Sequence, residues 1–132
     1  MDRDSLQWYV DICKTRLGLS HWKVEVDKDT SDDDAWADIE VSDNLWEATL
    51  RVSADFFDQT QLEQRRVIAH ELIHIHYAGV ERAVNMLNGV LGSEGFAIFE
   101  KLFDVETERG ADSLSKVLAP ILPLPQEVLP KS

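Results

Sequence analysis

The sequence predicts an α+β fold: an N-terminal helix, a three-stranded antiparallel-rich sheet and a series of helices. Two periodicities indicate it. Apolar residues recur at helical spacing over residues 5–17, 60–78 and 93–118, and alternate with polar residues in three short runs between residues 22 and 52. The length of 132 residues corresponds to one domain, 1–132, that is long enough to bury a core. We expect the core to span residues 5–120 and a proline-rich tail to span residues 120–132.

The first half of the chain supplies one helix and three strands. Gly18 is expected to end the helix over residues 5–17, and Cys13 on its apolar stripe is expected to be a core residue. The acidic segment 27–34 reads as a solvated loop, and residues 42–44 as a turn. The alternation predicts a sheet with one buried face. Its members are Trp22, Val24 and Val26, then Ala37, Ile39 and Val41, then Trp46, Ala48, Leu50 and Val52.

The second half is predicted to be helical. Thr60 and Glu63 have the spacing of a capping box, so a helix should start there, and Gly79 is a candidate stop. A shorter helix is expected over residues 80–88, and a long one from Gly92 to about residue 118. The four prolines from Pro120 onward predict an extended or partly disordered surface segment without further helix.

The most informative motif is His70-Glu71-Leu72-Ile73-His74. Residues four apart share one face of a helix, so the two imidazoles can bind the same zinc ion. Glu71 follows the first histidine and can act as a general base beside the open coordination position. The alternative is a helix that carries two histidines by chance.

A catalytic zinc usually takes three protein ligands, and the third must be found elsewhere. His76 points away from the metal-facing side and is expected to be a surface or packing residue, while His21 is a weak candidate. The expected ligand is therefore a carboxylate of the last long helix. Its candidates are Glu108 with Asp112, which we favour because the small Gly110 and Ala111 permit close helix approach, then Glu100 with Asp104, and Glu106.

With these residues the chain resembles a small gluzincin, similar to the minimal zincin-like metallopeptidase core of phage-encoded and SprT-like proteins. The run Leu17-Gly18-Leu19 leading to Trp22 also looks like the opening of small phage-type proteins. The chain departs from the SprT-like pattern because no histidine follows His76. The resemblance implies a His₂Glu zinc site, with Asp112 orienting His70.

The resemblance also implies a function. We expect zinc-dependent hydrolysis of a peptide or protein substrate, with Glu71 as the base. The substrate is expected beside an edge strand formed by Trp46, Ala48, Leu50 and Val52, and Tyr77 is a candidate oxyanion donor. The alternative is a non-catalytic zinc-binding module of phage-like origin that serves interaction or assembly.

Charge and composition restrict the partners. The net charge of −12 and the pI near 4.6 oppose binding to nucleic acid and to anionic membrane surfaces. The single cysteine excludes an intrachain disulfide, and the N-terminus lacks the pattern of a signal peptide. We therefore expect a cytoplasmic protein without a nucleic-acid or membrane partner, and the sequence leaves its oligomeric state open.

Overall fold

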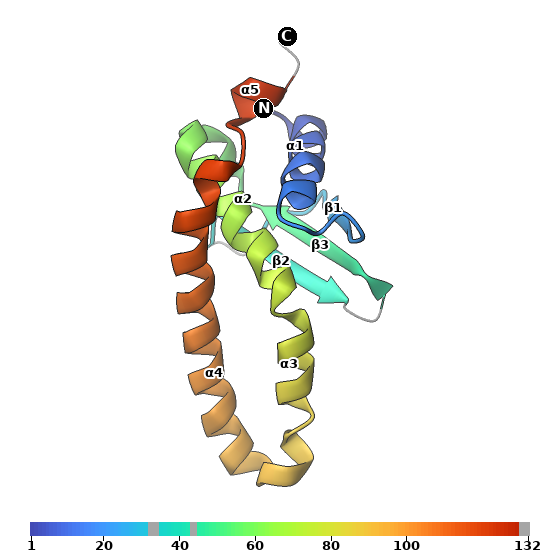
Figure 1. Cartoon of the computed structure of the whole chain (residues 1–132), viewed down its shortest axis with the longest axis vertical. Coiled ribbons are helices and arrows are strands. Elements are labelled where there is room, and N and C mark those ends of the chain that lie inside the picture. Colours follow the sequence, from blue (N-terminus) through green and yellow to red (C-terminus); the bar gives the residue numbers. More distant parts are fainter. Residues whose placement is uncertain (32–34, 43–44, 130–132) are drawn as a thin grey trace.

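The computed structural model describes residues 1–31, 35–42 and 45–129 and has an α+β architecture (Figure 1). Residues 32–34 of the predicted acidic loop, residues 43 and 44 of the predicted turn, and residues 130–132 of the tail lie outside the described residues. The elements follow in chain order. They are α1 (Arg3–Arg16), β1 (Lys23–Val26), β2 (Ala37–Ser42), β3 (Glu47–Val52), the 3₁₀ turn η2 (Ala54–Asp58), α2 (Gln61–His76), α3 (Ala78–Asn85), α4 (Asn88–Leu118), the 3₁₀ turn η3 (Ala119–Ile121) and α5 (Pro125–Val128).

The sheet is mixed, with the order β1-β3-β2. β1 pairs with β3 in parallel, with Lys23 opposite Glu47, whereas β2 pairs with β3 antiparallel, with Ala37 opposite Val52. The predicted antiparallel-rich sheet is therefore wrong in the β1–β3 pair. Alternation of apolar and polar residues reports which face of a strand is buried, but not the direction of its neighbour.

This order corrects the predicted edge strand. β3 lies in the middle of the sheet, paired with β1 over residues 47–50 and with β2 over residues 47–52, so it is not the edge strand that was expected to bind a peptide. Ala48, Leu50 and Val52 are buried in the core, and Trp46 precedes the strand with a φ of 56°. The edges belong to β1 and β2.

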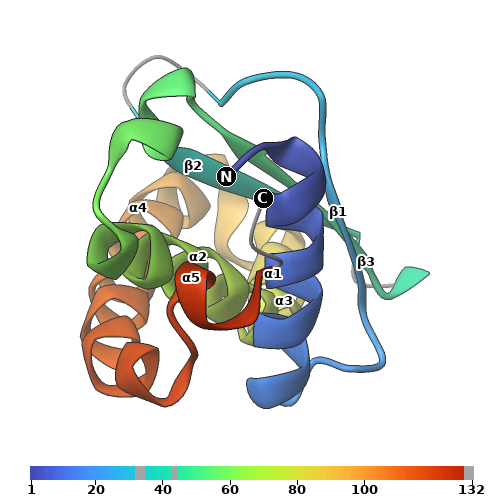
Figure 2. The ribbon, with the colours of Figure 1, turned by 90° about the horizontal axis from the view of Figure 1, so that it is seen from above.

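α1 and α2 pack against the sheet and bury the core between them (Figure 2). α1 contributes Leu6, Tyr9, Val10 and Cys13 to it, as the helical spacing predicts. Burial raises the pKa of the Cys13 thiol to about 12, so this cysteine is an unreactive packing residue. Gly18 has a φ of 77°, which is the left-handed conformation expected just after the end of α1.

The described part of the proline-rich tail folds back onto this core. The prediction of a segment without further helix is wrong for α5 (Pro125–Val128), which follows the 3₁₀ turn η3 (Ala119–Ile121). Pro120 lies in η3 and Pro125 begins α5, because proline is compatible with the first turn of a helix. Leu122 is buried, and the Tyr9 hydroxyl donates a hydrogen bond of 2.7 Å to the Pro123 carbonyl. The tail therefore closes the end of the domain where α1 starts.

α2 begins as predicted, with the Thr60 side chain accepting a hydrogen bond from the Glu63 amide at 3.2 Å. It ends at His76, and Gly79 lies inside α3 instead of stopping the preceding helix. Gly92, with a φ of 76°, kinks α4, so the long straight part of α4 follows it, as predicted. α3 and α4 form an antiparallel hairpin that extends beyond the sheet (Figure 1).

Candidate metal centre

α2 and α4 bring two imidazoles and one carboxylate together. His70 and His74 lie one turn apart on α2, and Glu108 reaches them from α4. The Glu108 oxygens lie 2.7 Å from His70 Nε2 and 3.0 Å from His74 Nε2, and the two Nε2 atoms lie 3.2 Å apart. Within the described ranges, these three residues form the group whose ligand atoms could hold a metal ion.

These distances suit zinc. In a tetrahedral site with bonds of about 2.0–2.2 Å, neighbouring donor atoms lie about 3.3 Å apart. The observed separations of 2.7–3.2 Å need only a small expansion to reach that value. Two imidazole nitrogens and one carboxylate oxygen are also a donor set of catalytic zinc sites, which keep the fourth position for solvent or substrate.

The protonation of the site also favours a cation. Burial lowers the pKa of His74 below its usual 6.5, and this effect outweighs the opposing attraction of the Glu108 carboxylate. Only a neutral imidazole offers a lone pair to a metal. His74 is therefore ready to bind a metal at neutral pH without first losing a proton.

Close approach of α4 to α2 depends on small residues, as the sequence predicts. Ala111 is fully buried, and a Cβ atom added to Gly110 would lie 2.8 Å from the Tyr77 hydroxyl oxygen. Tyr77 thus packs against α4 and is not among the side chains that line the groove described below. The expected role of Tyr77 as an oxyanion donor has no support in this position.

Glu71 follows His70 on α2, and its carboxyl is half-buried. Burial raises its pKa from 4.5 to about 8, and the nearby Glu108 and Asp38 carboxylates add to the shift. A cation held by His70, His74 and Glu108 would lower this pKa again, because it favours the charged form. Without a cation the Glu71 carboxyl therefore holds its proton at neutral pH, and a bound cation favours the ionised form that a general base requires.

Without metal, this carboxyl should make stability fall as pH rises. The unfolded chain ionises Glu71 near pH 4.5 and the folded chain only near pH 8, so between these values the folded state holds more protons. We expect metal-free protein to lose roughly 2–4 kcal/mol of unfolding free energy between pH 5 and 8 through this group. Urea unfolding at several pH values, followed by tryptophan fluorescence, measures it.

The control is the Glu71→Gln variant, which cannot ionise there. The lowered pKa of His74 acts in the opposite direction below pH 6.5 in both proteins, so the difference between their stability curves isolates Glu71. Parallel curves for the two proteins would contradict the raised pKa.

Asp112 lies beside the site but does not make the expected hydrogen bond. Its Oδ1 atom is 3.9 Å from His70 Nδ1, which is beyond hydrogen-bond distance. The carboxylate is closer to two cations: Lys116 at 3.2 Å and Arg66 at 3.7 Å. Arg66 itself pairs with Glu63 at 3.0 Å. Asp112 therefore lies on the Nδ1 side of the His70 ring, away from the Nε2 atom that faces Glu108, and its carboxylate interacts with Arg66 and Lys116.

The other predicted candidates lie away from the cluster. His76 is exposed and its Nε2 donates to the Leu17 carbonyl at 2.8 Å, which agrees with the expected surface or packing role. The His21 ring contacts the Trp22 and Trp46 rings. Glu106 pairs with Arg109 on the outside of α4. Glu100, the other candidate third ligand, is not part of the group formed by His70, His74 and Glu108.

A groove runs past the cluster along β2. Two adjoining hollows share Ala37 and Glu71, so Glu71 lies at their junction. The first hollow is also lined by Trp36, Arg66, Val67, His70 and Asp112. The second is also lined by Asp38, Ile39, Val41, His74, Glu81 and Glu108. The edge strand β2 therefore lines one side of the groove, and residues of α2, α3 and α4 line the other.

Sequence reasoning missed several of these lining residues. Arg66 lies one turn before His70 on the same helix, so helical spacing alone was a usable signal for it. Asp38 and Glu81 reach the groove only because β2 is an edge strand and α3 follows α2 closely, and no local pattern encodes those facts.

The chain matches no protein-family model, no curated protein and no solved structure. No helix in the described part of the chain is both long and apolar enough to cross a bilayer. The assignment of the site consequently rests on its own geometry.

Proposed function

We propose that this protein is a zinc-dependent peptidase of the gluzincin type. The proposal rests on one observation: His70, His74 and Glu108 converge within the span of a single cation, beside a groove whose midpoint is Glu71. A purely structural zinc site usually has four protein ligands and no need of a buried acid beside them. This favours an enzyme over the alternative of a non-catalytic zinc module.

The residues of the site would have distinct roles in hydrolysis. His70, His74 and Glu108 would hold the zinc, which when bound acidifies a water molecule and polarises a carbonyl. Glu71 takes the proton of the attacking water and passes it to the leaving nitrogen as the C–N bond breaks. The half-buried position of Glu71 strengthens its interactions with the attacking water and with the leaving nitrogen, because it limits competition from bulk water.

The substrate is proposed to lie along β2 instead of β3. β2 pairs with β3 on one side only, so its other edge has backbone groups that can bind an extended peptide as an added strand. Ala37 of β2 lines both hollows, so a peptide on this edge would pass Glu71. Backbone pairing of this kind gives affinity without sequence preference, and the hollows select side chains.

The second hollow, which His74 lines, is acidic. Asp38, Glu81 and Glu108 line it, with Asp38 held by Arg51 at 2.8 Å and Glu108 assigned to the metal. Glu81 therefore provides the charge that a substrate meets there, although burial and the neighbouring Asp104 raise its pKa. A substrate with a lysine or arginine near the scissile bond suits this end of the groove.

A peptide-library digest tests the proposed function and this preference together. Zinc-loaded protein should cleave library peptides, lose the activity with a chelator and regain it when zinc is restored. Cleaved peptides with Lys or Arg at one subsite should be favoured roughly fivefold, and Glu81→Gln should remove the preference, since one half-buried ion pair is worth about 1 kcal/mol.

Glu106→Gln, on the outer side of α4, is the matched control and should leave the preference intact. Absence of any zinc-dependent cleavage across the library would contradict the proposed function, whereas cleavage without the preference would contradict only the role of Glu81.

A further inference from the structure

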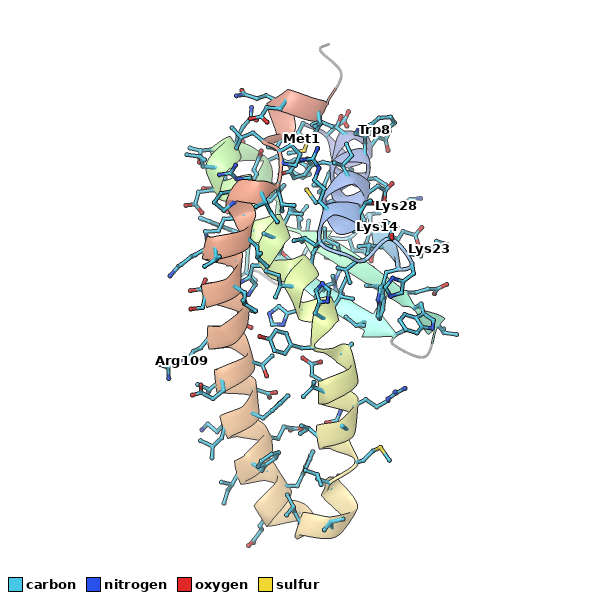
Figure 3. The ribbon with its side chains drawn as sticks, viewed as in Figure 1. Met1, Trp8, Lys14, Lys23, Lys28 and Arg109 are labelled. Carbon is cyan, nitrogen blue, oxygen red and sulfur yellow. The ribbon has the colours of Figure 1, made fainter. Side chains whose placement is uncertain are left out.

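One face of α4 is exposed and points away from the rest of the molecule. Arg109 projects outward from α4, on the side opposite α2 and α3 (Figure 3). Residues that precede Arg109 by about one, two, three and four turns share its face: Val105, Leu102, Ile98 and Glu94. Leu102 and Ile98 are 63% and 66% exposed, so the described part of the chain leaves this row uncovered.

The apolar residues of this row form one exposed patch. Ile98, Leu102 and Val105 are 66%, 63% and 49% exposed. With roughly 150–200 Å² for each such residue when fully exposed, they present roughly 250–350 Å² of apolar surface on one face of α4. Apolar patches of about 300–600 Å² on a monomer are often functional. The row is therefore large enough to form the apolar centre of a small interface.

The row is also complementary to itself. Read along α4 it runs from an acid through three apolar residues to a base: Glu94, Ile98, Leu102, Val105 and Arg109. When two such helices cross antiparallel near Leu102, Ile98 of each meets Val105 of the other, and Glu94 of each meets Arg109 of the other. A two-fold axis at Leu102 thus pairs apolar residues in the centre and opposite charges at both ends.

We propose that the outward face of α4 is a dimer interface, occupied by the same face of a second copy of this chain in antiparallel orientation. The net charge of −12 disfavours an anionic lipid surface as the occupant. The existing pair between Arg109 and Glu106, 3.3 Å long with both side chains more than 70% exposed, is weak and can be exchanged for Glu94 of the second copy.

Sedimentation velocity across a concentration series tests the interface. The wild-type chain should sediment at twice its mass of 15.0 kDa, and Leu102→Glu should raise the dimer dissociation constant at least about 100-fold, because each dimer loses the apolar side chain twice. Arg109→Glu should weaken the dimer about tenfold, and adding Glu94→Arg to it should restore the affinity, since the charges are then swapped.

Leu62→Glu is the matched control, because Leu62 is the same residue with nearly the same exposed fraction, 62%, but lies on α2. It should leave the dimer intact, and circular dichroism checks that each variant is folded. A wild-type chain that stays monomeric up to about 100 μM would overturn the proposal. So would a dimer that survives Leu102→Glu, or a charge swap that fails to rescue Arg109→Glu.

Discussion

Replacing Glu71 by glutamine is expected to abolish peptide hydrolysis while zinc stays bound. Glutamine keeps the size of the side chain but cannot accept the proton of the attacking water. General-base catalysis contributes about 10²–10⁴-fold, so kcat should fall by that factor with little change in KM. Zinc content should remain one per chain, because Glu71 is not part of the group formed by His70, His74 and Glu108.

The comparison that gives this result its meaning is Glu106→Gln. Glu106 is also a glutamate and precedes Glu108 by two residues, but it pairs with Arg109 on the exposed side of α4. This variant should hydrolyse peptide at the wild-type rate. Undiminished hydrolysis by Glu71→Gln, or an equal loss in both variants, would remove Glu71 from the mechanism.

The second large effect concerns the third ligand. Glu108→Ala removes the carboxylate that lies 2.7 Å from His70 Nε2 and 3.0 Å from His74 Nε2. Two histidines alone bind zinc weakly, so the zinc dissociation constant should rise on the order of 10³-fold, and activity should be lost with the metal. Competition with a chromophoric chelator measures the constant.

Glu100→Ala is the matched control, because Glu100 was the other candidate ligand on the same helix. Its zinc affinity should equal that of the wild type, since Glu100 is not part of the described cluster. Loss of zinc from Glu100→Ala alone would refute the assignment of Glu108. Zinc binding also stabilises the folded state, so thermal unfolding with and without zinc gives a second reading of the same comparison.

The helices before the tail and the grouping of His70, His74 and Glu108 could be predicted from the sequence, because local signals specify them. The Thr60 cap and the four-residue spacing of His70 and His74 are properties of one helix. Glu108 was accessible for a different reason: Gly110 and Ala111 mark where α4 is narrow enough to approach α2. In each case a short stretch of sequence carries the physical cause.

The arrangement of the strands was not accessible in that way. Ala48, Leu50 and Val52 alternate as a half-buried strand does, whether that strand is at the edge or in the centre. The prediction for the proline-rich tail failed for a related reason. Proline excludes helix interiors but not first turns, and the bond from Tyr9 to the Pro123 carbonyl, 114 residues apart, decides where the tail lies. Long-range pairings of this kind leave no local pattern.

The central claim is that His70, His74 and Glu108 bind one zinc ion. A crystal structure of the zinc-loaded protein, with anomalous diffraction at the zinc edge, tests it most directly. We expect one anomalous peak at about 2.0–2.2 Å from both Nε2 atoms and from a Glu108 oxygen, with a fourth position open towards the groove along β2. A peak elsewhere on the chain, or imidazole rings that turn away from each other in the presence of zinc, would contradict the claim.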